Sequence, residues 1–477
     1  MGAQRSLPKK LITSLFAVFA LALATAIPAS MAKAQPVTPI QHVVLIDLEN
    51  DSFDHLLGFW CDEPQNTGRC PDGGMPTGPV TLSDGEQVSI WTPGDKNPDV
   101  EHNVTAQAAA IDGGRMDGWE NITGPQGDCN ASTGWPCMTG YQPSQLPNLT
   151  TLASGFAISD MTFTAAASPS WAGHMEAVAA SQDGFQGNNP HCPGGKTCGP
   201  GWGCDSGNLA PWVNASGVIT QEPSCVPDHN LGTARYPYGG ALRQTPVKYV
   251  PTIMDRLDAG GLSWRIYSAV KGTKGWGNWN ICPTFAECLD TAQVANVVPD
   301  AQFLTDAAAG KLPAFSVVTP GGPKFTSGCH NGMSMTGCDN WIGQLAGAIE
   351  TSPEWSSTAV FITFDDCGAF YDQVPPPVEP DGVQEGPRVP MIIMSPYARP
   401  GFTDRTPATF DGVLAFTEHT FGLAPLTAED GSAYDFSGAF DYSQVPLKPA
   451  RMVTRPLSAG ARSLVQHPPA SLINDPS

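Results

Sequence analysis

Residues 42–50 read HVVLIDLEN and residues 359–366 read AVFITFDD, so two apolar runs far apart in the chain each stop at acidic or amide side chains. Their β-branched and aromatic residues favour buried strands of a parallel sheet. In open α/β sheets, ligands bind outside the carboxyl ends of the strands. We therefore expect four side chains to meet at one edge of a sheet: Glu49, Asn50, Asp365 and Asp366.

The three carboxylates of this group would repel one another and raise each other's pKa values unless a cation neutralised them. The pattern therefore predicts a metal-assisted hydrolase. Oxygen-only ligands favour a hard divalent cation such as Mg²⁺, Ca²⁺ or Mn²⁺, although Zn²⁺ or iron remains an alternative. Either cluster by itself could instead supply helix N-caps, for which Asp and Asn are favoured.

The N-terminus has the pattern of a secretory signal peptide. Basic residues precede an apolar stretch from Leu11 to about Ile27, and Ala32-Lys-Ala34 has small residues at the spacing of a cleavage site. A membrane anchor is the other interpretation, but the stretch is short for a bilayer span and no later segment is long and apolar enough. We expect residues 1–34 to be removed and the protein to be secreted or periplasmic.

The net charge of the chain is strongly negative. Loss of residues 1–34 removes four basic residues and no acidic one, so the formal net charge goes from −21 to −25. Nucleic acid and anionic membrane surfaces are poor partners for such a chain.

The thirteen cysteines fit an oxidising compartment. Most fall into close couples along the chain, and six disulfides are expected: Cys61 with Cys70, Cys129 with Cys137, Cys192 with Cys198, Cys204 with Cys225, Cys282 with Cys288, and Cys329 with Cys338. Cys367 is left over, beside the second acidic cluster. It is either a small buried hydrophobic residue or a reactive thiol or ligand.

Length and composition indicate one catalytic domain over residues 35–450, a C-terminal tail over 451–477, and no repeats. Strands are predicted at 42–48, about 156–163, 263–269, 314–319, 359–364 and 388–395, with helices between them. Asp339 is expected to cap a helix that carries apolar residues from Ile342 to Ile349, and another helix is expected to end at Gly155. Residues from about 183 to 240 have little periodicity and are predicted to form a disulfide-stapled insertion beside the active site.

A third segment supplies the expected nucleophile. Residues 168–174 read SPSWAGH, follow a predicted strand and lead into a strong helix former, so Ser170 would lie at a helix N-terminus. Unpaired backbone N–H groups and the positive end of the helix dipole there stabilise an alkoxide and a phosphoryl group. An ordinary N-cap serine is the commoner use of such a residue.

Several motifs resemble the bacterial phosphoesterase family that contains phospholipases C and an acid phosphatase. Residues 40–55, IQHVVLIDLENDSFDH, resemble the opening motif of that family, and residues 364–377, FDDCGAFYDQVPPP, resemble its Asp-Asp/Glu-x-Gly-Gly-Phe-Tyr-Asp-His-Val-Pro-Pro-Pro. Residues 386–398, GPRVPMIIMSPYA, are similar to its next strand. Further matches at 411–426 and 439–443 keep the order of the family's signatures, so the resemblance runs from about residue 40 to 447.

The resemblance implies an α/β fold of the alkaline-phosphatase-like group, with a central sheet flanked by helices on both faces and, here, stapled loop insertions. It also implies the roles of individual residues. The implied metal ligands are Glu49, Asn50, Asp365, Asp366 and Ser170. Ser170 occupies the place of the family's nucleophile and would form a phosphoserine, while His102 and His330 match family histidines that donate hydrogen bonds or a proton.

The implied activity is hydrolysis of phosphate esters, as an acid phosphatase or a phospholipase C, on a small-molecule phosphate ester or a phospholipid head group. A sulfatase-like hydrolase is less well supported, because no C-x-P-x-R motif is found. A non-catalytic secreted binding protein on the same fold is the other alternative, and the intact ligand and nucleophile positions argue against it.

This sequence departs from the family pattern at three positions of the second motif. Ala369 replaces a glycine, Gln373 replaces a histidine, and Cys367 stands where relatives often have an aromatic or small residue. None of these changes removes an expected ligand, but they leave the specificity for the leaving group open. A further active-site histidine of some relatives has no assigned counterpart, and three histidines remain candidates: His174, His191 and His229.

Overall fold

The computed structural model describes residues 38–71, 74–199, 201–214, 216–228, 249–273, 275–321, 328–379 and 382–467. The expected signal peptide, His229 and part of the expected insertion lie outside these residues. From Pro36 on, the contacts within the chain group the residues into one compact unit. Among the described residues, every helix is too short or too polar to cross a membrane.

An eight-stranded mixed sheet forms the centre of this unit, in the order β12-β4-β11-β10-β1-β9-β7-β8. Its strands are β1 (His42–Leu48), β4 (Ala157–Ser159), β7 (Trp264–Ser268), β8 (Val297–Pro299), β9 (Phe315–Val318), β10 (Thr358–Phe364), β11 (Met391–Met394) and β12 (Thr403–Asp404). The chain also has two small hairpins, β2 (Val80–Thr81) with β3 (Gln87–Val88), and β5 (Leu209–Val213) with β6 (Ile219–Pro223).

The two strands predicted from residues 42–50 and 359–366 are neighbours in the sheet. β1 and β10 pair in parallel, from His42 opposite Thr358 to Leu48 opposite Phe364. Five of the six predicted strands match β1, β7, β9, β10 and β11, whereas the sixth is shorter than predicted because β4 ends at Ser159. β11 runs antiparallel to both of its neighbours, and the short edge strands β8 and β12 were not predicted.

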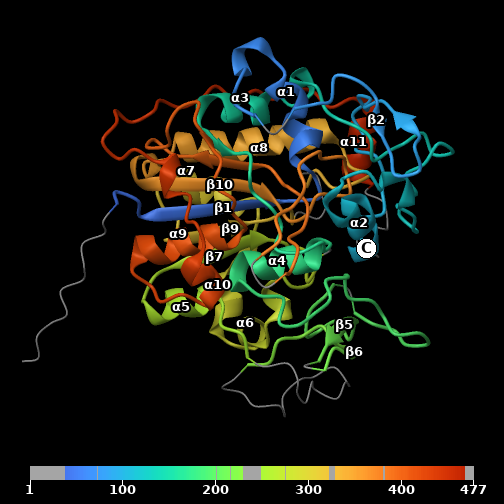
Figure 1. Ribbon diagram of the computed structural model, residues 1–477. Coiled ribbons are helices and arrows are strands. Elements are labelled where there is room, and N and C mark those ends of the chain that lie inside the picture. Colours follow the sequence, from blue (N-terminus) through green and yellow to red (C-terminus); the bar gives the residue numbers. More distant parts are fainter. Residues whose placement is uncertain are drawn as a thin grey trace, which may run out of the picture. The chain divides into compact units, whose positions relative to one another are not determined.

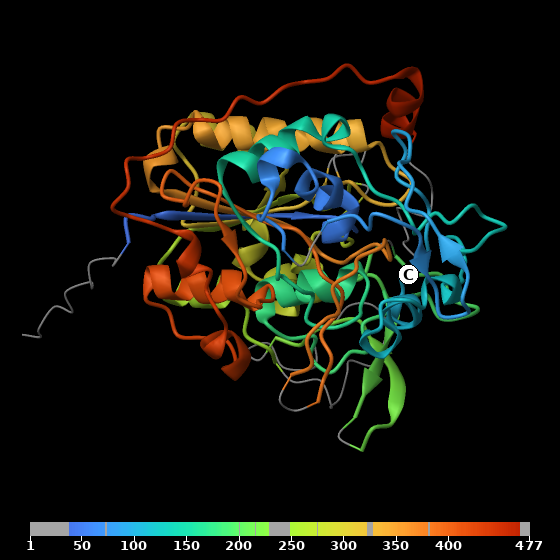
Figure 2. The same ribbon diagram turned by 45° about the horizontal axis from the view of Figure 1, so that its top comes forward.

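Helices cover both faces of the sheet, as Figures 1 and 2 show, and this confirms the predicted α/β class. α3 (Pro147–Gly155) and α8 (Met335–Glu350) lie on one face, and α4 (Ser170–Ala179), α5 (Ile253–Ala259) and α9 (Asp411–Phe421) lie on the other. The remaining helices are α1 (Phe59–Cys61), α2 (Val104–Ile111), α6 (Ala286–Asp290), α7 (Gln302–Ala308), α10 (Ala428–Ser432) and α11 (Ala459–Gln466).

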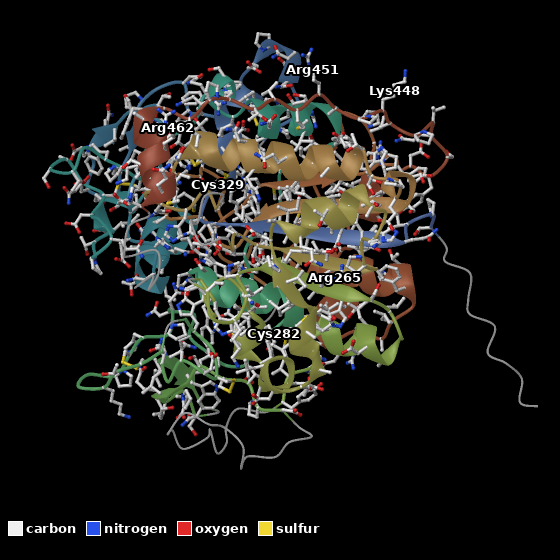
Figure 3. All side chains as sticks on the ribbon, turned by 180° about the vertical axis from the view of Figure 1, so that it is seen from behind. Arg265, Cys282, Cys329, Lys448, Arg451 and Arg462 are labelled. Carbon is white, nitrogen blue, oxygen red and sulfur yellow. A yellow bond between two sulfur atoms is a disulfide. The ribbon has the colours of Figure 1, made fainter. Side chains whose placement is uncertain are left out.

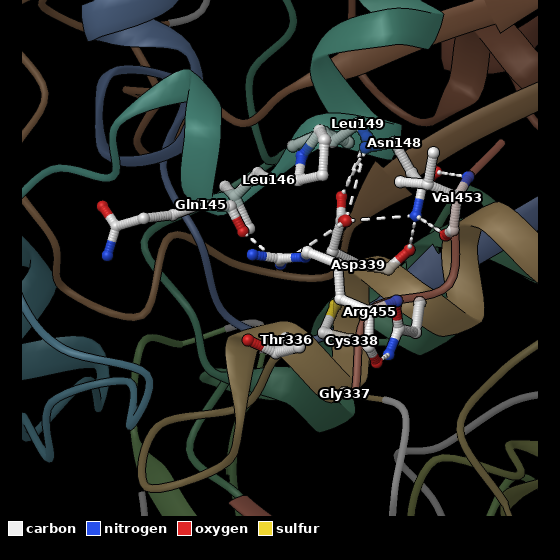
Figure 4. Close-up of polar contacts among 12 residues, drawn as sticks. Gln145, Leu146, Asn148, Leu149, Thr336, Gly337, Cys338, Asp339, Val453 and Arg455 are labelled. Carbon is white, nitrogen blue, oxygen red and sulfur yellow. Dashed lines mark hydrogen bonds and ion pairs between the residues drawn. The ribbon is translucent and has the colours of Figure 1, made fainter. Parts of the chain in front are cut away.

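The prediction that Asp339 caps its own helix is wrong. α8 begins four residues earlier, and its N-cap is Ser334, whose hydroxyl accepts the Gly337 amide at 3.1 Å. Asp339 instead accepts the backbone N–H groups of Asn148 and Leu149, each at 3.0 Å, at the start of α3 (Figure 4). Its carboxylate therefore caps a neighbouring helix through tertiary packing, which local sequence patterns do not report.

After α10 the chain runs back along α3 and α8, and residues 441–458 of this stretch form neither helix nor strand. The Asn148 amide donates to the Val453 carbonyl at 2.8 Å and accepts the Val453 N–H at 2.7 Å. Asn340 makes the same pair of bonds with the backbone of Arg455, each at 2.8 Å. Two side-chain amides thus hold this extended segment, as Figure 4 shows for Asn148 and Val453.

All six predicted disulfides are present, and Cys367 is the free, buried cysteine. Each joins residues close in the chain and staples a loop rather than the sheet. Figure 3 labels Cys282 and Cys329, the first members of two of these bridges.

Candidate active site

The carboxyl ends of β1 and β10 bring the four predicted ligands together. Because the strands are parallel and in register, Glu49-Asn50 and Asp365-Asp366 follow them at the same edge of the sheet. The Asp365 N–H donates to the Leu48 carbonyl at 2.9 Å, and the Asn50 N–H donates to Asp365 Oδ1 at 2.9 Å. All four side chains are buried, each exposing at most 1% of its surface.

Ser170 is the first residue of α4 and faces this group. Its Oγ atom lies 3.2 Å from Asn50 Oδ1 and 3.4 Å from Asp366 Oδ2. One turn of helix away, Gly173 lets α4 lie directly against the end of β10, because a Cβ atom at this position would be 2.3 Å from the Asp365 carbonyl oxygen. The glycine therefore sets how close the helix N-terminus comes to the acidic cluster.

The surroundings of the Asn50 amide test whether a cation fits. The side-chain oxygen Oδ1 of Asn50 lies 3.2 Å from Ser170 Oγ. A nitrogen in its place, with the amide rotated by 180°, would lie 3.2 Å from Glu49 Oε2 and 3.1 Å from Asp365 Oδ1, so the oxygen has these two carboxylate atoms as neighbours as well. The oxygen thus points into a space bordered by three other oxygens. A hard divalent cation would hold it there, since oxygen atoms at such spacing are the ligands that these ions prefer. The residues fit a cation.

Both predicted histidines lie on the far side of the same amide. His102 Nε2 is 2.8 Å from the Asn50 amide nitrogen, and His330 Nε2 lies 3.2 Å from that atom. Backbone carbonyls orient both rings, Val100 at 3.0 Å from His102 Nδ1 and Asn331 at 2.9 Å from His330 Nδ1. The two ring centroids are 5.7 Å apart.

The structure adds His174, which the sequence had left without a role. Its Nδ1 atom lies 2.7 Å from Asp47 Oδ2, and its Nε2 atom lies 3.0 Å from Glu49 Oε1 and 3.7 Å from Asp365 Oδ2. One atom each from Glu49, His174 and Asp365 lie within 4.8 Å of one another, a grouping that could hold a metal ion. The spacing of His174, four residues after Ser170 on one helix face, was the available signal.

His191, the next candidate histidine, is exposed, and its described contact is a backbone pairing with Leu209.

Residues 40–424 match the model of the Phosphoesterase family. The chain belongs to this family. Non-specific phospholipase C1 of Arabidopsis thaliana is 24% identical over 82% of this chain and 66% of its own length, so the chain spans slightly under two thirds of that relative. Phospholipase C A of Mycobacterium tuberculosis is 23% identical over 90% of this chain and 82% of its own.

Hydrolysis of phosphoric esters is the class of reaction that the family membership and the names of these relatives support. A solved structure described as a protein in the alkaline phosphatase superfamily, from Vibrio parahaemolyticus, aligns with 75% of this chain and 72% of its own at 13% identity and a TM-score of 0.32.

Burial dominates the electrostatics of the candidate site. It raises the pKa of Glu49 well above its ordinary value, and the Asp365 carboxylate adds to this effect. Burial likewise raises the pKa of Asp47. For His174, burial favours the neutral ring, but the carboxylates of Asp47 and Glu49 outweigh it and raise the pKa well above the usual range. The His174 ring thus adds one positive group among several buried carboxylates, and a bound cation would supply further positive charge.

A buried ion-pair network supports both halves of the site. Arg388 is fully buried, and it pairs with Asp54 at 2.8 Å and with Asp372 at 3.1 Å. Asp54 belongs to the opening motif of the family, residues 40–55, and Asp372 belongs to the later motif, residues 364–377. Removing one partner of such a network would leave an uncompensated buried charge, so the network holds the loops after β1 and β10 in one arrangement.

The three departures from the family pattern, Cys367, Ala369 and Gln373, all lie in the loop after β10. Gln373 is half-buried, its side chain donates to the Gly74 carbonyl and its backbone N–H donates to Asp54 at 3.0 Å. Ala369 is buried at φ +52°, in the left-handed region that glycine adopts at lower cost. Cys367 is 1% exposed, and burial, together with the nearby Asp366 charge, raises the pKa of its thiol well above the ordinary value.

Proposed function

We propose that this chain is an exported, cation-dependent phosphoesterase that works through a phosphoserine formed on Ser170. The observation that carries the proposal is the position of the Ser170 hydroxyl. It lies at the first residue of α4, 3.2 Å from Asn50 Oδ1 and 3.4 Å from Asp366 Oδ2. A serine that only capped its helix would not need a buried group of acidic and amide side chains around it.

The reaction follows from the residue types around Ser170. Its Oγ atom forms a bond to phosphorus while the bond from phosphorus to the alcohol oxygen breaks. The hydroxyl proton has a carboxylate acceptor in Asp366, and the departing alkoxide takes up a proton. Water then attacks the phosphoserine, which releases phosphate, or a phosphorylated head group from a diester, and restores the hydroxyl.

Other residues of the site stabilise charge. The N-terminal N–H groups of α4 favour negative charge on the serine oxygen and on a phosphoryl group. His102 and His330 can donate hydrogen bonds to phosphoryl oxygens or a proton to the leaving group. A divalent cation held by Glu49, Asn50, Asp365 and Asp366 would neutralise charge on the nucleophile and on the phosphoryl oxygens.

For the substrate, the relatives named as phospholipases C favour the phosphodiester of a phospholipid, with a phosphate monoester as the second candidate. The six disulfides and the predicted signal peptide support export to an oxidising compartment. A formal charge of −21 for the whole chain disfavours nucleic acid as a partner.

One assay tests the proposal. The chain from Gln35 on, prepared with its disulfides formed, is incubated with phosphatidylcholine vesicles and separately with p-nitrophenyl phosphate, each with and without chelator. We expect diacylglycerol release from the vesicles, loss of activity with chelator, and recovery when a divalent cation is returned. Chelator-resistant turnover would contradict the cation, and hydrolysis of the monoester alone would assign the protein to the phosphatases.

Trapping the intermediate tests the nucleophile. Brief incubation with substrate, acid quenching and peptide mapping should place phosphate on Ser170. The Ser168→Ala variant is the matched control, because Ser168 is a neighbouring buried serine whose hydroxyl bonds only the Ala166 carbonyl at 3.3 Å among its described contacts. Phosphate on any other residue would contradict the assignment.

A further inference from the structure

The first turn of α4 is capped by a residue from outside the helix. Pro169 occupies the N-cap position before Ser170, and its side chain makes no hydrogen bond to the helix. Asn189 caps the helix instead, because its Oδ1 atom accepts the Trp171 N–H at 2.9 Å. Asn189 is 3% exposed and belongs to the stapled segment of residues 183–228. The start of the helix is therefore held by a side chain 18 residues further along the chain.

The residue before Asn189 makes the same kind of contact with a second helix. Asn188 Oδ1 accepts the N–H of Val104, the first residue of α2, at 3.1 Å. His102, which donates to phosphoryl oxygens or the leaving group in the proposed function, lies two residues before Val104. Two adjacent asparagines thus hold the starts of two helices, one that follows His102 and one that begins with Ser170.

The chain leaves a paired strand to reach the two helices. The Gln186 N–H donates to the Pro211 carbonyl and the His191 N–H donates to the Leu209 carbonyl, each at 2.9 Å. Residues 187–190 thus stand opposite a single residue of β5 and bulge out of the pairing. Bulges of this kind are frequent next to active sites, where they re-aim side chains.

Gly187 lets the bulge lie close to both segments. Its φ is +82°, and a Cβ atom at this position would lie 2.8 Å from the Ser168 Cβ atom and 3.0 Å from Val104 Cγ2. Gln107, a fully buried residue of α2, joins the same two segments a second time. Its Nε2 atom donates to the carbonyls of His102 and Ser168, each at 2.8 Å. The segment that carries His102 and the segment that leads to the nucleophile are therefore fixed to each other.

We propose that Gly187-Asn188-Asn189 is a positioning element of the active site, which fixes the Ser170 hydroxyl relative to the His102 ring. This inference rests on the proposed function. The two asparagines act through the starts of α4 and α2 and are positioning residues. A displacement of a reacting group by about 1 Å can lower a rate by about 100-fold, so the cap on α4 should govern the rate of attack by Ser170. The proposed cation ligands follow β1 and β10, so cation binding should not depend on this element.

Kinetics of the variants test the positioning role. The substrate is p-nitrophenyl phosphorylcholine, a soluble phosphodiester, or p-nitrophenyl phosphate if the protein hydrolyses only monoesters. We expect Asn189→Ala to lower kcat by about tenfold or more, while KM and the bound cation per chain change by less than about twofold. Asn189→Asp keeps an acceptor oxygen in the same place and should recover most of the lost kcat.

Asn208→Ala is the matched control. Asn208 is another buried asparagine of the stapled segment, and its side-chain amide donates to the Gly201 carbonyl at 2.6 Å, within that segment. The variant removes a buried amide in the same way but leaves the 187–189 contacts in place. We expect it to keep the wild-type kcat.

Hydrogen exchange tests the contacts without any turnover. Mass spectrometry of peptides that cover residues 168–176 and 102–108 reports the N–H groups at the starts of α4 and α2. We expect exchange at the start of α4 to be about fivefold faster in Asn189→Ala, the effect of losing a helix cap. Asn188→Ala should have this effect at the start of α2, and Asn208→Ala should have neither.

The possible results separate this inference from the proposed function. A wild-type kcat in Asn189→Ala, or an equal loss of kcat in Asn208→Ala, would overturn the positioning role alone. Unchanged exchange in Asn189→Ala would overturn it as well. A wild-type chain without turnover would contradict the proposed function and, with it, this inference. If circular dichroism shows that Asn189→Ala does not fold, Asn188→Ala takes its place, with the same expected loss of kcat and the same contradicting result.

Discussion

The hydroxyl oxygen of Ser170 lies 3.2 Å from the side-chain oxygen of Asn50, although 120 residues separate the two in the chain. The contact depends on three features at once: the start of α4 at Ser170, the close packing of Gly173 on the end of β10, and the left-handed backbone of Asn50 at φ +59°. Asn tolerates that conformation better than most residues, so the sequence can turn sharply after β1.

Removal of this hydroxyl should stop the reaction and leave the fold intact. We expect Ser170→Ala to lose turnover on both substrate classes while its free energy of unfolding falls by only about 1 kcal/mol, the usual net contribution of a hydrogen bond, because the hydroxyl contacts Asn50 and Asp366 and does not cap the helix. Steady-state kinetics and denaturant unfolding measure the two effects. Activity within a few-fold of wild type would show that another group is the nucleophile.

Neutralising one acidic ligand at a time should weaken cation binding. Glu49→Gln and Asp365→Asn each delete a charge that a hard cation needs, and we expect affinity to fall by at least about tenfold in each. Calorimetric titration and metal analysis of the purified variants provide the readout. The exposed Asp441→Asn is the control and should bind like wild type. Full occupancy and normal activity in both ligand variants would remove the proposed site.

Ala369 should be replaceable by glycine with a gain in stability. Its φ of +52° is strained for a residue with a Cβ atom, and glycine relieves that strain. We expect Ala369→Gly to raise the free energy of unfolding by up to about 1 kcal/mol, because some of the relief is offset by greater unfolded-state entropy. Ala108→Gly, on an exposed turn of α2, should have the opposite sign, since glycine inside a helix costs about 1 kcal/mol. Loss of stability in both variants would contradict the strain at Ala369.

Buried carboxyl groups on the α9 side should make the fold more stable in mild acid. Burial raises the pKa of Glu418 to about 8, with the Asp430 carboxyl facing it, and raises that of Glu385 to about 8 as well. The pKa values of both groups in the folded protein exceed the ordinary 4.5. Between about pH 4.5 and pH 8 the folded protein therefore binds more protons than the unfolded chain. The stability they contribute is full below about pH 4.5 and is lost as the pH rises through about 8.

We therefore expect a lower thermal midpoint at pH 8.5 than at pH 5.5. Glu418→Gln should reduce this difference, because the amide is neutral at both pH values, whereas the exposed Glu86→Gln should not change it. Scanning calorimetry across the range is the measurement. A midpoint that rises steadily from pH 5.5 to 8.5 would show that these carboxyl groups do not govern the dependence.

Cys367 should be the single reactive thiol, and only after unfolding. Its burial and raised pKa keep the thiol protonated and out of reach of reagents in the folded protein. Alkylation without reductant should label one cysteine per chain in denaturant and none in native buffer, and peptide mapping should place the label at Cys367. Cys367→Ser should keep most activity with a modest loss of stability. Bound metal lost from that variant would mean that the thiol is a ligand.

The sequence by itself determined the features that depend on local pattern. Buried β-branched runs predicted β1 and β10, and because parallel strands end at one edge of a sheet, the residues after them were placed together correctly. Close spacing along the chain also predicted all six disulfides, since short loops bring their ends together without help from the rest of the fold. The start of α4 at Ser170 followed from its neighbours in the same way.

Only the tertiary structure decided which groups from separate elements meet. Asp339 caps α3 rather than its own helix, because α8 packs beside the start of α3. His174 reaches Asp47 and Glu49 because Gly173 lets α4 approach the end of β10 and the carboxyl edge of β1. Hydrophobic periodicity reports which face of a helix is buried, but not what that face lies against. The approach of one element to another depends on close packing across the whole core, and no local pattern in the chain records it.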